Sequence, residues 1–518
     1  MNKRAFTFRF LTLFFLILGI LMTGCACRST NIQEKEQAGR PACIDPDYSG
    51  TVLPPNIAPV NFRIRETGQE YRIEIQSLKG RPVLLHSKNG DVTIPVKAWK
   101  DLLFQNKGQD LHFRITVRNE GRWIEFDPVT NHIAKDAIDP FLVYRLIQPM
   151  YYYWGKMGLY QRNLENYQEK PLLLNRAVDR ACMNCHAFCN HDPGKMMFHM
   201  RSQTVGGLYL VRQDKVDRIN TKTPFNPGAA VYPAWHPNGK IIAFSLNKLR
   251  QYFHAVGENR EVIDHASDLI LYFPESNTVT TCPEIANPDI QETFPAWSPD
   301  GQYLYFCSAA QTPSIHNYHH VKYDLTRIEY HPDTGVWGTP ETLLSSAKTD
   351  QSALLPRISP DGQHLLFCMV DHGNFPAFIQ DCNLYLMNLK NRKVRELEHV
   401  NSPCTDSYHT WSSNSRWFVF SSKRRDNVCA LPYICHVDEQ GAVSKPFLLP
   451  QKNPQHYDFE LMTYNLPELI QSPVKLNARQ VARKAFDEHS VINAVLDPQV
   501  PVPERKGEHG QEDQAIPL

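Results

Sequence analysis

Four copies of one segment in the second half of the chain constrain the fold more than any other feature. In each copy a strand ends at an aromatic or branched residue, a turn follows, and a strand rich in Ile, Leu, Val and Phe comes next. Proline presets φ in such a turn and glycine supplies a positive φ. The copies are YPAWHPNGKIIAFS from Tyr232, FPAWSPDGQYLYFCS from Phe294, LPRISPDGQHLLFCM from Leu355 and YHTWSSNSRWFVFSS from Tyr408.

A second strand-like unit accompanies these copies, as in DLILYF from Asp268 and NLYLMN from Asn383. Four strands per repeat, recurring around a ring, are typical of a β-propeller, which leaves few exposed sheet edges. GGLYLV from Gly206 is a leading half-unit, which favours a closure in which the first and last strands share a blade. We therefore predict an all-β chain with a propeller of five or six blades over residues 206–473.

The repeated W-SPDG-aliphatic-Phe pattern resembles the TolB-like β-propeller family over about half of the chain. The fourth copy departs from it, with Ser413-Asn414-Ser415 where the others have Pro-Asn/Asp-Gly, so its turn is expected to differ. Nothing in this sequence matches the α/β N-terminal domain of TolB itself. The resemblance therefore implies a fold and not a function.

The residues before the repeats alternate apolar and polar side chains, as in Phe62 and Ile64, then Tyr71, Ile73 and Ile75. Period-2 alternation is typical of antiparallel strands with one buried face, so 51–135 are predicted as a small β-sandwich-like domain. Residues 26–50 are predicted as a flexible tether and 136–205 as an aromatic connector with the haem segment described below. Residues 474–518 are predicted as a short helix and a disordered tail.

The N-terminus indicates export. Lys3 and Arg4 precede an apolar run that is too short to span a bilayer comfortably, which is typical of a signal peptide. The run ends in Leu21-Met22-Thr23-Gly24-Cys25, which resembles a lipobox, so residues 1–25 are predicted as a lipoprotein signal with Cys25 as the lipidated residue. We expect a membrane-anchored lipoprotein of the bacterial envelope that faces the periplasm. No acidic residue follows Cys25 directly, which favours the outer membrane.

The motif that carries chemistry is Cys182-Met183-Asn184-Cys185-His186, because C-x-x-C-H is the attachment signature of c-type haem. Cys182 and Cys185 would form the two thioethers, and His186 would bind the haem iron as its proximal ligand. Three alternatives remain open: a thioredoxin-like pair, a zinc site that includes Cys189 and His191, and a structural disulfide. Export favours the haem interpretation, because covalent haem attachment belongs to the same compartment.

Residues 182–209 also resemble the haem segment of cytochrome c proteins fused to TolB-like propellers. The resemblance rests on the C-x-x-C-H motif, the cluster Lys195-Met196-Met197 and the strand Gly207-Leu208-Tyr209. His199, Met200 and Met197 are within reach as the distal iron ligand, and an open iron is a further alternative. A Met ligand raises the reduction potential and a His ligand lowers it. Arg201 is a candidate to pair with a haem propionate.

The first functional hypothesis is electron transfer by one haem c, with the propeller as docking platform for a redox partner protein. The second is a binding or scaffold module with a structural or sensory haem, and the third is a haem enzyme acting on a small oxidant. No other catalytic set is evident, so an enzyme is the less favoured class. Lys and Arg number 55 against 54 Asp and Glu, without a concentrated basic run, which argues against nucleic acid as a partner.

Overall fold

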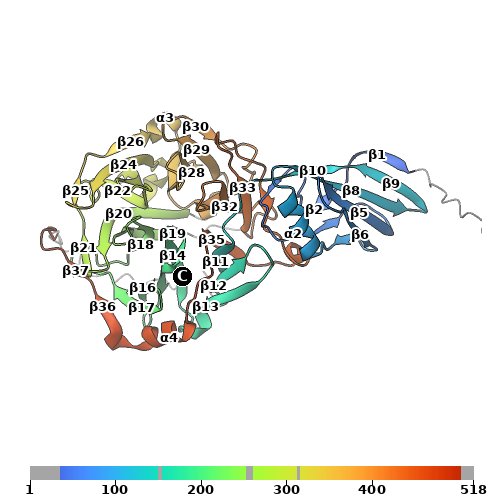
Figure 1. The fold of residues 1–518 in the computed structure, drawn as a ribbon. Coiled ribbons are helices and arrows are strands. Elements are labelled where there is room, and N and C mark those ends of the chain that lie inside the picture. Colours follow the sequence, from blue (N-terminus) through green and yellow to red (C-terminus); the bar gives the residue numbers. More distant parts are fainter. Residues whose placement is uncertain (1–34, 150–154, 253–260, 312–314, 503–518) are drawn as a thin grey trace, which may run out of the picture.

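Six antiparallel sheets account for most of the chain in the computed structural model, which describes residues 35–149, 155–252, 261–311 and 315–502 (Figure 1). The innermost strand of each sheet contacts the innermost strand of the next, and the last contacts the first, so the sheets form a closed, propeller-like ring. The expected all-β class is confirmed. The inner strands are β14 (Cys182–Cys189), β18 (Val231–Trp235), β22 (Ile290–Trp297), β27 (Ser352–Ile358), β31 (Asp406–Trp411) and β35 (Thr463–Ile470).

At least three further strands complete each sheet outwards. We name each sheet by its inner strand. The second strands are β15 (Asp192–Arg201), β19 (Ile242–Tyr252), β23 (Tyr303–Ala310), β28 (His364–Val370), β32 (Trp417–Ser422) and β11 (Phe141–Ile147). The third are β16 (Gly207–Arg212), β20 (Glu261–Phe273), β24 (Asp324–His331), β29 (Asn383–Asn388), β33 (Leu431–His436) and β12 (Gly158–Asn163). The outer ones are β17 (Lys215–Asn220), β21 (Thr278–Thr280), β25 (Val336–Trp337) with β26 (Glu341–Leu344), β30 (Val394–Glu396), β34 (Phe447–Leu448) and β13 (Glu169–Leu174).

The turns between first and second strands follow the sequence pattern. Gly239, Gly301 and Gly362 have φ of 69°, 73° and 71°, which glycine adopts without steric cost. In the fourth copy Ser415 adopts the left-handed φ instead, at 62°, and its N–H donates to the carbonyl of Ser412 at 3.0 Å. The turn geometry is therefore kept without Pro-Asp-Gly, contrary to the expectation.

The ring begins earlier in the chain than the predicted boundary at 206. β11, β12 and β13 come from the expected connector and join β35, which lies at the far end of the sequence. The C-x-x-C-H segment is itself the inner strand β14 and not a separate haem segment. The connector's YYYW cluster at 151–154 lies outside the described residues.

The N-terminal domain consists of two sheets and a helix, α2 (Val96–Gln105). Its first strand begins at Glu36, so strand structure starts inside the expected tether 26–50. One sheet contains β1 (Glu36–Pro41), β9 (Arg122–Asp127), β8 (Asp110–Asn119), β10 (Val129–Ile133), β3 (Val52–Leu53), β5 (Glu70–Ser77) and β6 (Val83–Ser87). The other contains β2 (Ile44–Asp45), β4 (Phe62–Ile64) and β7 (Asp91–Val92).

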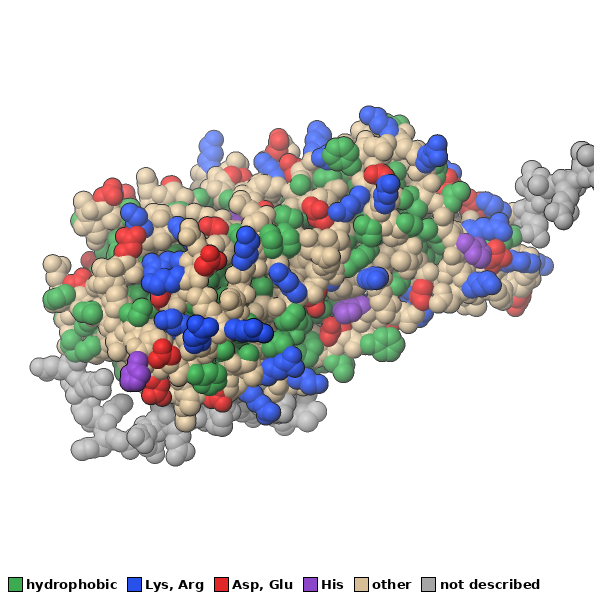
Figure 2. Space-filling model, turned by 60° about the horizontal axis from the view of Figure 1, so that its bottom comes forward, with side chains coloured by type: hydrophobic (Ala, Val, Ile, Leu, Met, Phe, Trp, Pro, Cys, Tyr) green, Lys and Arg blue, Asp and Glu red, His purple; other side chains and the backbone are tan. Residues whose placement is uncertain are grey.

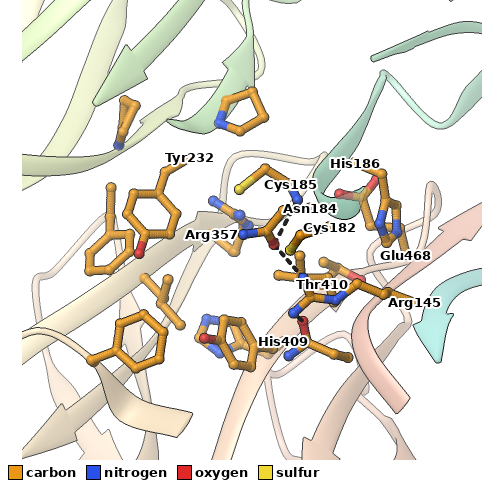
Figure 3. A pocket seen from close by; sticks show the side chains of 18 of the residues that line it. Arg145, Cys182, Asn184, Cys185, His186, Tyr232, Arg357, His409, Thr410 and Glu468 are labelled. Atoms are coloured by element: carbon orange, nitrogen blue, oxygen red, sulfur yellow. Dashed lines mark hydrogen bonds between the residues drawn. The ribbon is translucent and has the colours of Figure 1, made fainter. Parts of the chain in front are cut away.

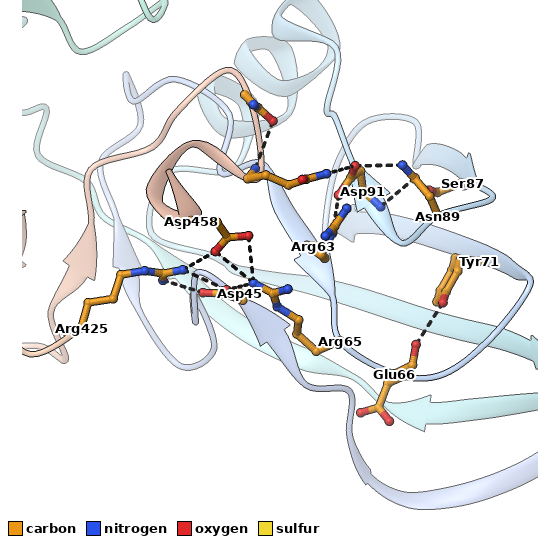
Figure 4. A network of polar contacts seen from close by, with 12 residues as sticks. Asp45, Arg63, Arg65, Glu66, Tyr71, Ser87, Asn89, Asp91, Arg425 and Asp458 are labelled. Carbon is orange, nitrogen blue, oxygen red and sulfur yellow. Dashed lines mark hydrogen bonds and ion pairs between the residues drawn. The ribbon is translucent and has the colours of Figure 1, made fainter. Parts of the chain in front are cut away.

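The N-terminal domain packs against the β31 sheet. One hydrophobic core is continuous between the two parts, with Trp417 fully buried in it. An ion network crosses the same junction (Figure 4): Arg425 donates to Asp45 at 2.8 Å and to Asp458 at 2.7 Å, and Arg65 contacts both carboxylates. Apolar burial and charge pairing together therefore join the domain to the ring.

The C-terminal segment is more ordered than predicted within its described part. Helix α4 (Ala478–Phe486) is capped by Asn477, whose side chain accepts from two backbone N–H groups, and it packs on β17. β36 (Val491–Asn493) and β37 (Val495–Leu496) then extend the β14 and β18 sheets by parallel pairing. The segment thus covers the outer edges of two neighbouring sheets. Residues 503–518 lie outside the described part.

Candidate functional site

Every inner strand contains a bulge at the same place. In each, one residue adopts a left-handed φ near 50° and the pairing register with the next strand shifts there. Such a φ is uncommon for residues other than glycine, so its recurrence marks a feature of the fold. The residues are Cys185, Tyr232, Phe294, Leu355, Tyr408 and Leu466.

The bulge decides where the cysteines of β14 point. In a regular strand residues three apart face opposite sides of the sheet. Because Cys185 is the bulged residue, this alternation is broken, and Cys182 and Cys185 both line the central channel (Figure 3). His186 and Asn184 line it as well. The structure therefore brings the three predicted residues Cys182, Cys185 and His186 to one wall.

The channel is open at its mouth to solvent, and about 1240 Å³ of empty space lies between its walls when the part open to solvent is included. Aromatic and apolar side chains from several sheets form much of its wall, and arginines form much of the remainder. The aromatic members are Tyr232, Phe294, Phe375, Phe378 and Tyr408, and the charged members are Arg145, Arg201, Arg357 and Glu468. Such a mainly apolar pocket with a few convergent polar groups is typical of a small-molecule or cofactor site.

His186 is 3% exposed, and its ring nitrogens make no hydrogen bond of regular geometry, although the backbone at Val143 and Leu466 lies close to the ring. Burial, with the charge of Arg145, lowers the pKa of His186 to about 3, and the backbone near Val143 and Leu466 offsets only a smaller part of this shift. The imidazole is therefore neutral at physiological pH. A neutral imidazole with a free lone pair is the form of histidine that binds a metal ion.

Arg145 fixes β14 in place. From β11 its guanidinium donates to the carbonyl of Met183 at 3.0 Å and to Asn184 Oδ1 at 2.8 Å. Its other amino group donates to Asn465 Oδ1 of β35 at 2.6 Å. One buried side chain thus ties the C-x-x-C-H strand to both the second and the inner strand of the neighbouring sheet.

The thiols of β14 differ in their surroundings. Burial raises the pKa of Cys185, so the group is a protonated thiol at neutral pH. Cys189, from the alternative zinc set, does not line the channel. Its Sγ lies 3.8 Å from the carbonyl oxygen of His236 in the core between the β14 and β18 sheets. Within the described residues, no three His, Cys, Asp or Glu side chains are grouped to hold a metal ion.

The three distal-ligand candidates all lie on β15 and none lines the channel. Met200 pairs with Met183 and belongs to the core shared with the β35 sheet, whereas Met197 belongs to the core shared with the β18 sheet. His199 is buried, its Nδ1 has no hydrogen-bond partner, and burial lowers its pKa to about 3. The structure does not bring these side chains together with Cys182, Cys185 and His186.

His409 is a channel residue that none of the motifs in the sequence singles out. His409 follows the bulged residue of β31 as His186 follows that of β14, and both line the channel. Its Nε2 lies 2.9 Å from the carbonyl oxygen of Leu366, and its Nδ1 lies 3.7 Å from the Sγ of Cys368. Aligning YHTW of the fourth repeat with the CHAF of β14 would have shown the equivalence.

The surface adds little to the site. On the face drawn in Figure 2 basic and acidic side chains are interspersed. Among the described helices, none has the length and apolar character required to cross a membrane. Cys25 and the rest of the predicted signal lie outside the described residues.

No model of a known protein family matches the sequence, and no curated protein matches it either. Among solved structures, a DUF4784 family protein from Bacteroides caccae is 9% identical, with a TM-score of 0.31 over 70% of this chain and 97% of that one. A prolyl endopeptidase is 11% identical, with a TM-score of 0.34 over 60% of this chain and 42% of that one. A puromycin-hydrolyzing peptidase from Mycobacterium tuberculosis is 11% identical, with a TM-score of 0.33 over 78% and 57%. Likenesses this distant carry no argument about function.

Proposed function

We propose that the chain is a c-type haem protein for electron transfer, built on a TolB-like six-bladed propeller and anchored to the envelope through a lipid on Cys25. The observation that carries the proposal is the convergence of Cys182, Cys185 and His186 on one channel wall. The bulge that recurs in every inner strand produces this convergence at Cys185, and a plain structural disulfide would not require His186 beside the two thiols.

The residues present fit haem c. Cys182 and Cys185 would hold the macrocycle through two thioether bonds, and His186, a buried imidazole that is neutral at physiological pH, would bind the iron. When bound, the haem supplies reversible one-electron chemistry. The zinc alternative loses support, because Cys189 points into a different core.

This chain's own residues would hold and tune the group. Arg145 keeps β14 in position through its bonds to Met183 and Asn184, which orients His186. The aromatic side chains of the wall, among them Tyr232, Phe294 and Tyr408, would cover part of the bound group against water. The reduction potential of a haem depends on how deeply it is buried and on its axial ligands. The residues of the channel wall would therefore control this potential.

A second candidate follows from the place of Met197, His199 and Met200 outside the channel. If no protein side chain takes the distal position, the iron would accept an external ligand, which favours a haem enzyme acting on a small oxidant. A binding or scaffold module with a structural or sensory haem has the same attachment site. The spin state of the iron separates the enzyme from the other two functions. An open iron is high-spin and binds added ligands, as the enzyme requires, whereas a six-coordinate iron is low-spin.

The test is an optical spectrum of the full chain matured with a haem-attachment system. We expect a c-type α-band that persists after denaturation, and its loss in Cys182→Ala/Cys185→Ala. Cys189→Ala is the matched control, because this thiol lies on the same strand but outside the channel, and it should retain the band. A wild-type protein without haem, where a control cytochrome matures, would overturn the proposal.

A further inference from the structure

The channel carries an excess of positive charge. Among its described lining residues, three are arginines and one is a glutamate. Burial raises the pKa of that carboxyl group, Glu468, to about 7, although the nearby Arg357 lowers it, so it is only partly ionised near neutral pH. Charged groups in a partly desolvated cavity are costly unless an opposite charge accompanies them. Glu468 by itself does not balance three guanidinium groups.

Arg201 is the channel arginine whose positive charge has the fewest partners. It lies at the end of β15, directly opposite Cys182 on β14, and its guanidinium makes no hydrogen bond or ion pair with any described residue. Burial raises the pKa of both Cys185 and Tyr232, and the charge of Arg201 opposes the shift in each. Arg201 therefore lies on the same wall as the two cysteines, opposite Cys182, and close enough to Cys185 and Tyr232 for its charge to act on both.

The other two arginines are better satisfied. Arg145 donates to three acceptors, although its buried Nε has no partner. Arg357 donates to the carbonyl of Pro356 at 3.2 Å and has Glu468 as its countercharge. The uncompensated charge is thus concentrated at Arg201, with Arg145 nearby, since both act on Cys185 and Tyr232.

We propose that the channel contains a carboxylate subsite beside Cys185, in which Arg201 is the principal cation and Arg145 supports it, and that its ligand is a dicarboxylate. A planar guanidinium donates two parallel hydrogen bonds to one carboxylate, which makes carboxylates its preferred partners. Where the ligand is haem, this subsite rests on the proposed function and receives the propionates. Where it is not, the same subsite takes a free organic dicarboxylate.

The experiment uses the full chain carrying Cys182→Ala/Cys185→Ala, which cannot form thioethers, with circular dichroism to verify folding. Ferric protoporphyrin IX, its dimethyl ester and succinate are titrated separately, with absorbance and thermal unfolding as readouts. The variants are Arg201→Ala, Arg201→Lys and, as a control of equal chemistry, Arg114→Ala on the exposed face of the N-terminal domain. Succinate is also titrated into the chain that retains Cys182 and Cys185, so that a folding defect of the double variant cannot explain a lack of binding.

We expect Arg201→Ala to weaken the binding of the carboxylate ligand about tenfold or more. The affinity should recover in part in Arg201→Lys and stay unchanged in Arg114→Ala. Weaker binding of the dimethyl ester than of the free porphyrin shows that the porphyrin propionates are the carboxylates that the subsite binds. Succinate binding that depends on Arg201, without porphyrin binding, supports the subsite and overturns the haem proposal. Equal binding of porphyrin and ester, unaffected by Arg201→Ala, overturns the subsite and leaves the haem proposal standing. Binding of none of the three probes overturns the subsite as well.

Discussion

Replacing Arg425 with alanine should weaken the junction between the N-terminal domain and the ring. Arg425 is 25% exposed and contacts both Asp45 and Asp458, so its removal leaves two carboxylates to share Arg65 (Figure 4). Exposed ion pairs contribute about 0.2–1 kcal/mol, and breaking a buried pair costs about 3–5 kcal/mol. For this partly buried network we expect a loss of about 2 kcal/mol in the free energy of unfolding.

The assay is urea unfolding in a double-mutant cycle of Asp45→Asn and Arg425→Ala. Because the two residues are in direct contact, their effects should not add, and a coupling energy of about 1 kcal/mol is expected. Burial raises the pKa of Asp45, but hydrogen bonds from Arg425 and Arg65 outweigh it and hold the pKa below its usual value of 3.8. A depressed carboxylate pKa stabilises the fold above the unfolded pKa and loses that contribution as pH falls through the folded pKa. The difference between wild type and Arg425→Ala should therefore shrink below about pH 4.

Lys100→Ala is the control, because its pair with Glu165 is more exposed, with 39% and 36% of the two side chains accessible, and should contribute less than about 1 kcal/mol. If Arg425→Ala lowers the free energy of unfolding no more than Lys100→Ala does, and if the effects of Asp45→Asn and Arg425→Ala are additive, the ion network does not join the domain to the ring.

Three other perturbations test other parts of the structure. Trp417→Ala empties a fully buried site in the core common to both parts, so chemical denaturation should show a loss of about 3–5 kcal/mol, and a loss below about 1 kcal/mol would contradict that packing. Burial raises the pKa of Glu468 to about 7 from its ordinary 4.5, so wild-type stability should fall as pH rises from about 4.5 through 7. Glu468→Gln should remove only the part of that dependence that Glu468 contributes, because burial also raises the pKa of Asp264 to about 7 and that of Asp268 to about 6, and an unchanged pH profile would refute the assignment. Val481→Asp places a charge at a fully buried position of α4, so limited proteolysis should cleave the C-terminal segment faster than in wild type, and equal rates would show that α4 is not docked through Val481.

The sequence predicted the ring where its local signals were strong. The turn residues around Gly301 and Gly362 and the aliphatic strands after them identified four of the six sheets, because turn chemistry and strand pattern are local properties. The β35 sheet escaped detection, because its inner strand and its partner β11 come from opposite ends of the ring and share no turn. Only part of the β14 sheet was identified, as the half-unit from Gly206, because Cys185-His186-Ala187-Phe188 was interpreted only as a haem motif, although it occupies the place of Tyr232-Pro233-Ala234-Trp235.

The candidate site was predictable in part for the same reason. Cys182, Cys185 and His186 were identified from their spacing, and the structure places them on one channel wall. Their shared orientation depends on the left-handed φ of Cys185, which no residue preference of cysteine predicts. Arg145, Arg357, His409 and Glu468 reach the channel through strands far apart in sequence, and only the closed ring brings them together.

The way the ring closes determines when the cysteines of β14 become buried. Arg145 and its partner Asn465 are 320 residues apart in the sequence, so β14 lacks its neighbour on one side until almost the whole chain has been synthesised. Before that moment the sulfurs of β14 are accessible, and afterwards Cys182 and Cys185 are 6% and 5% exposed. An enzyme that modifies these sulfurs would therefore reach them more easily before β35 docks than afterwards, so a slower docking of β35 should raise the yield of modified protein.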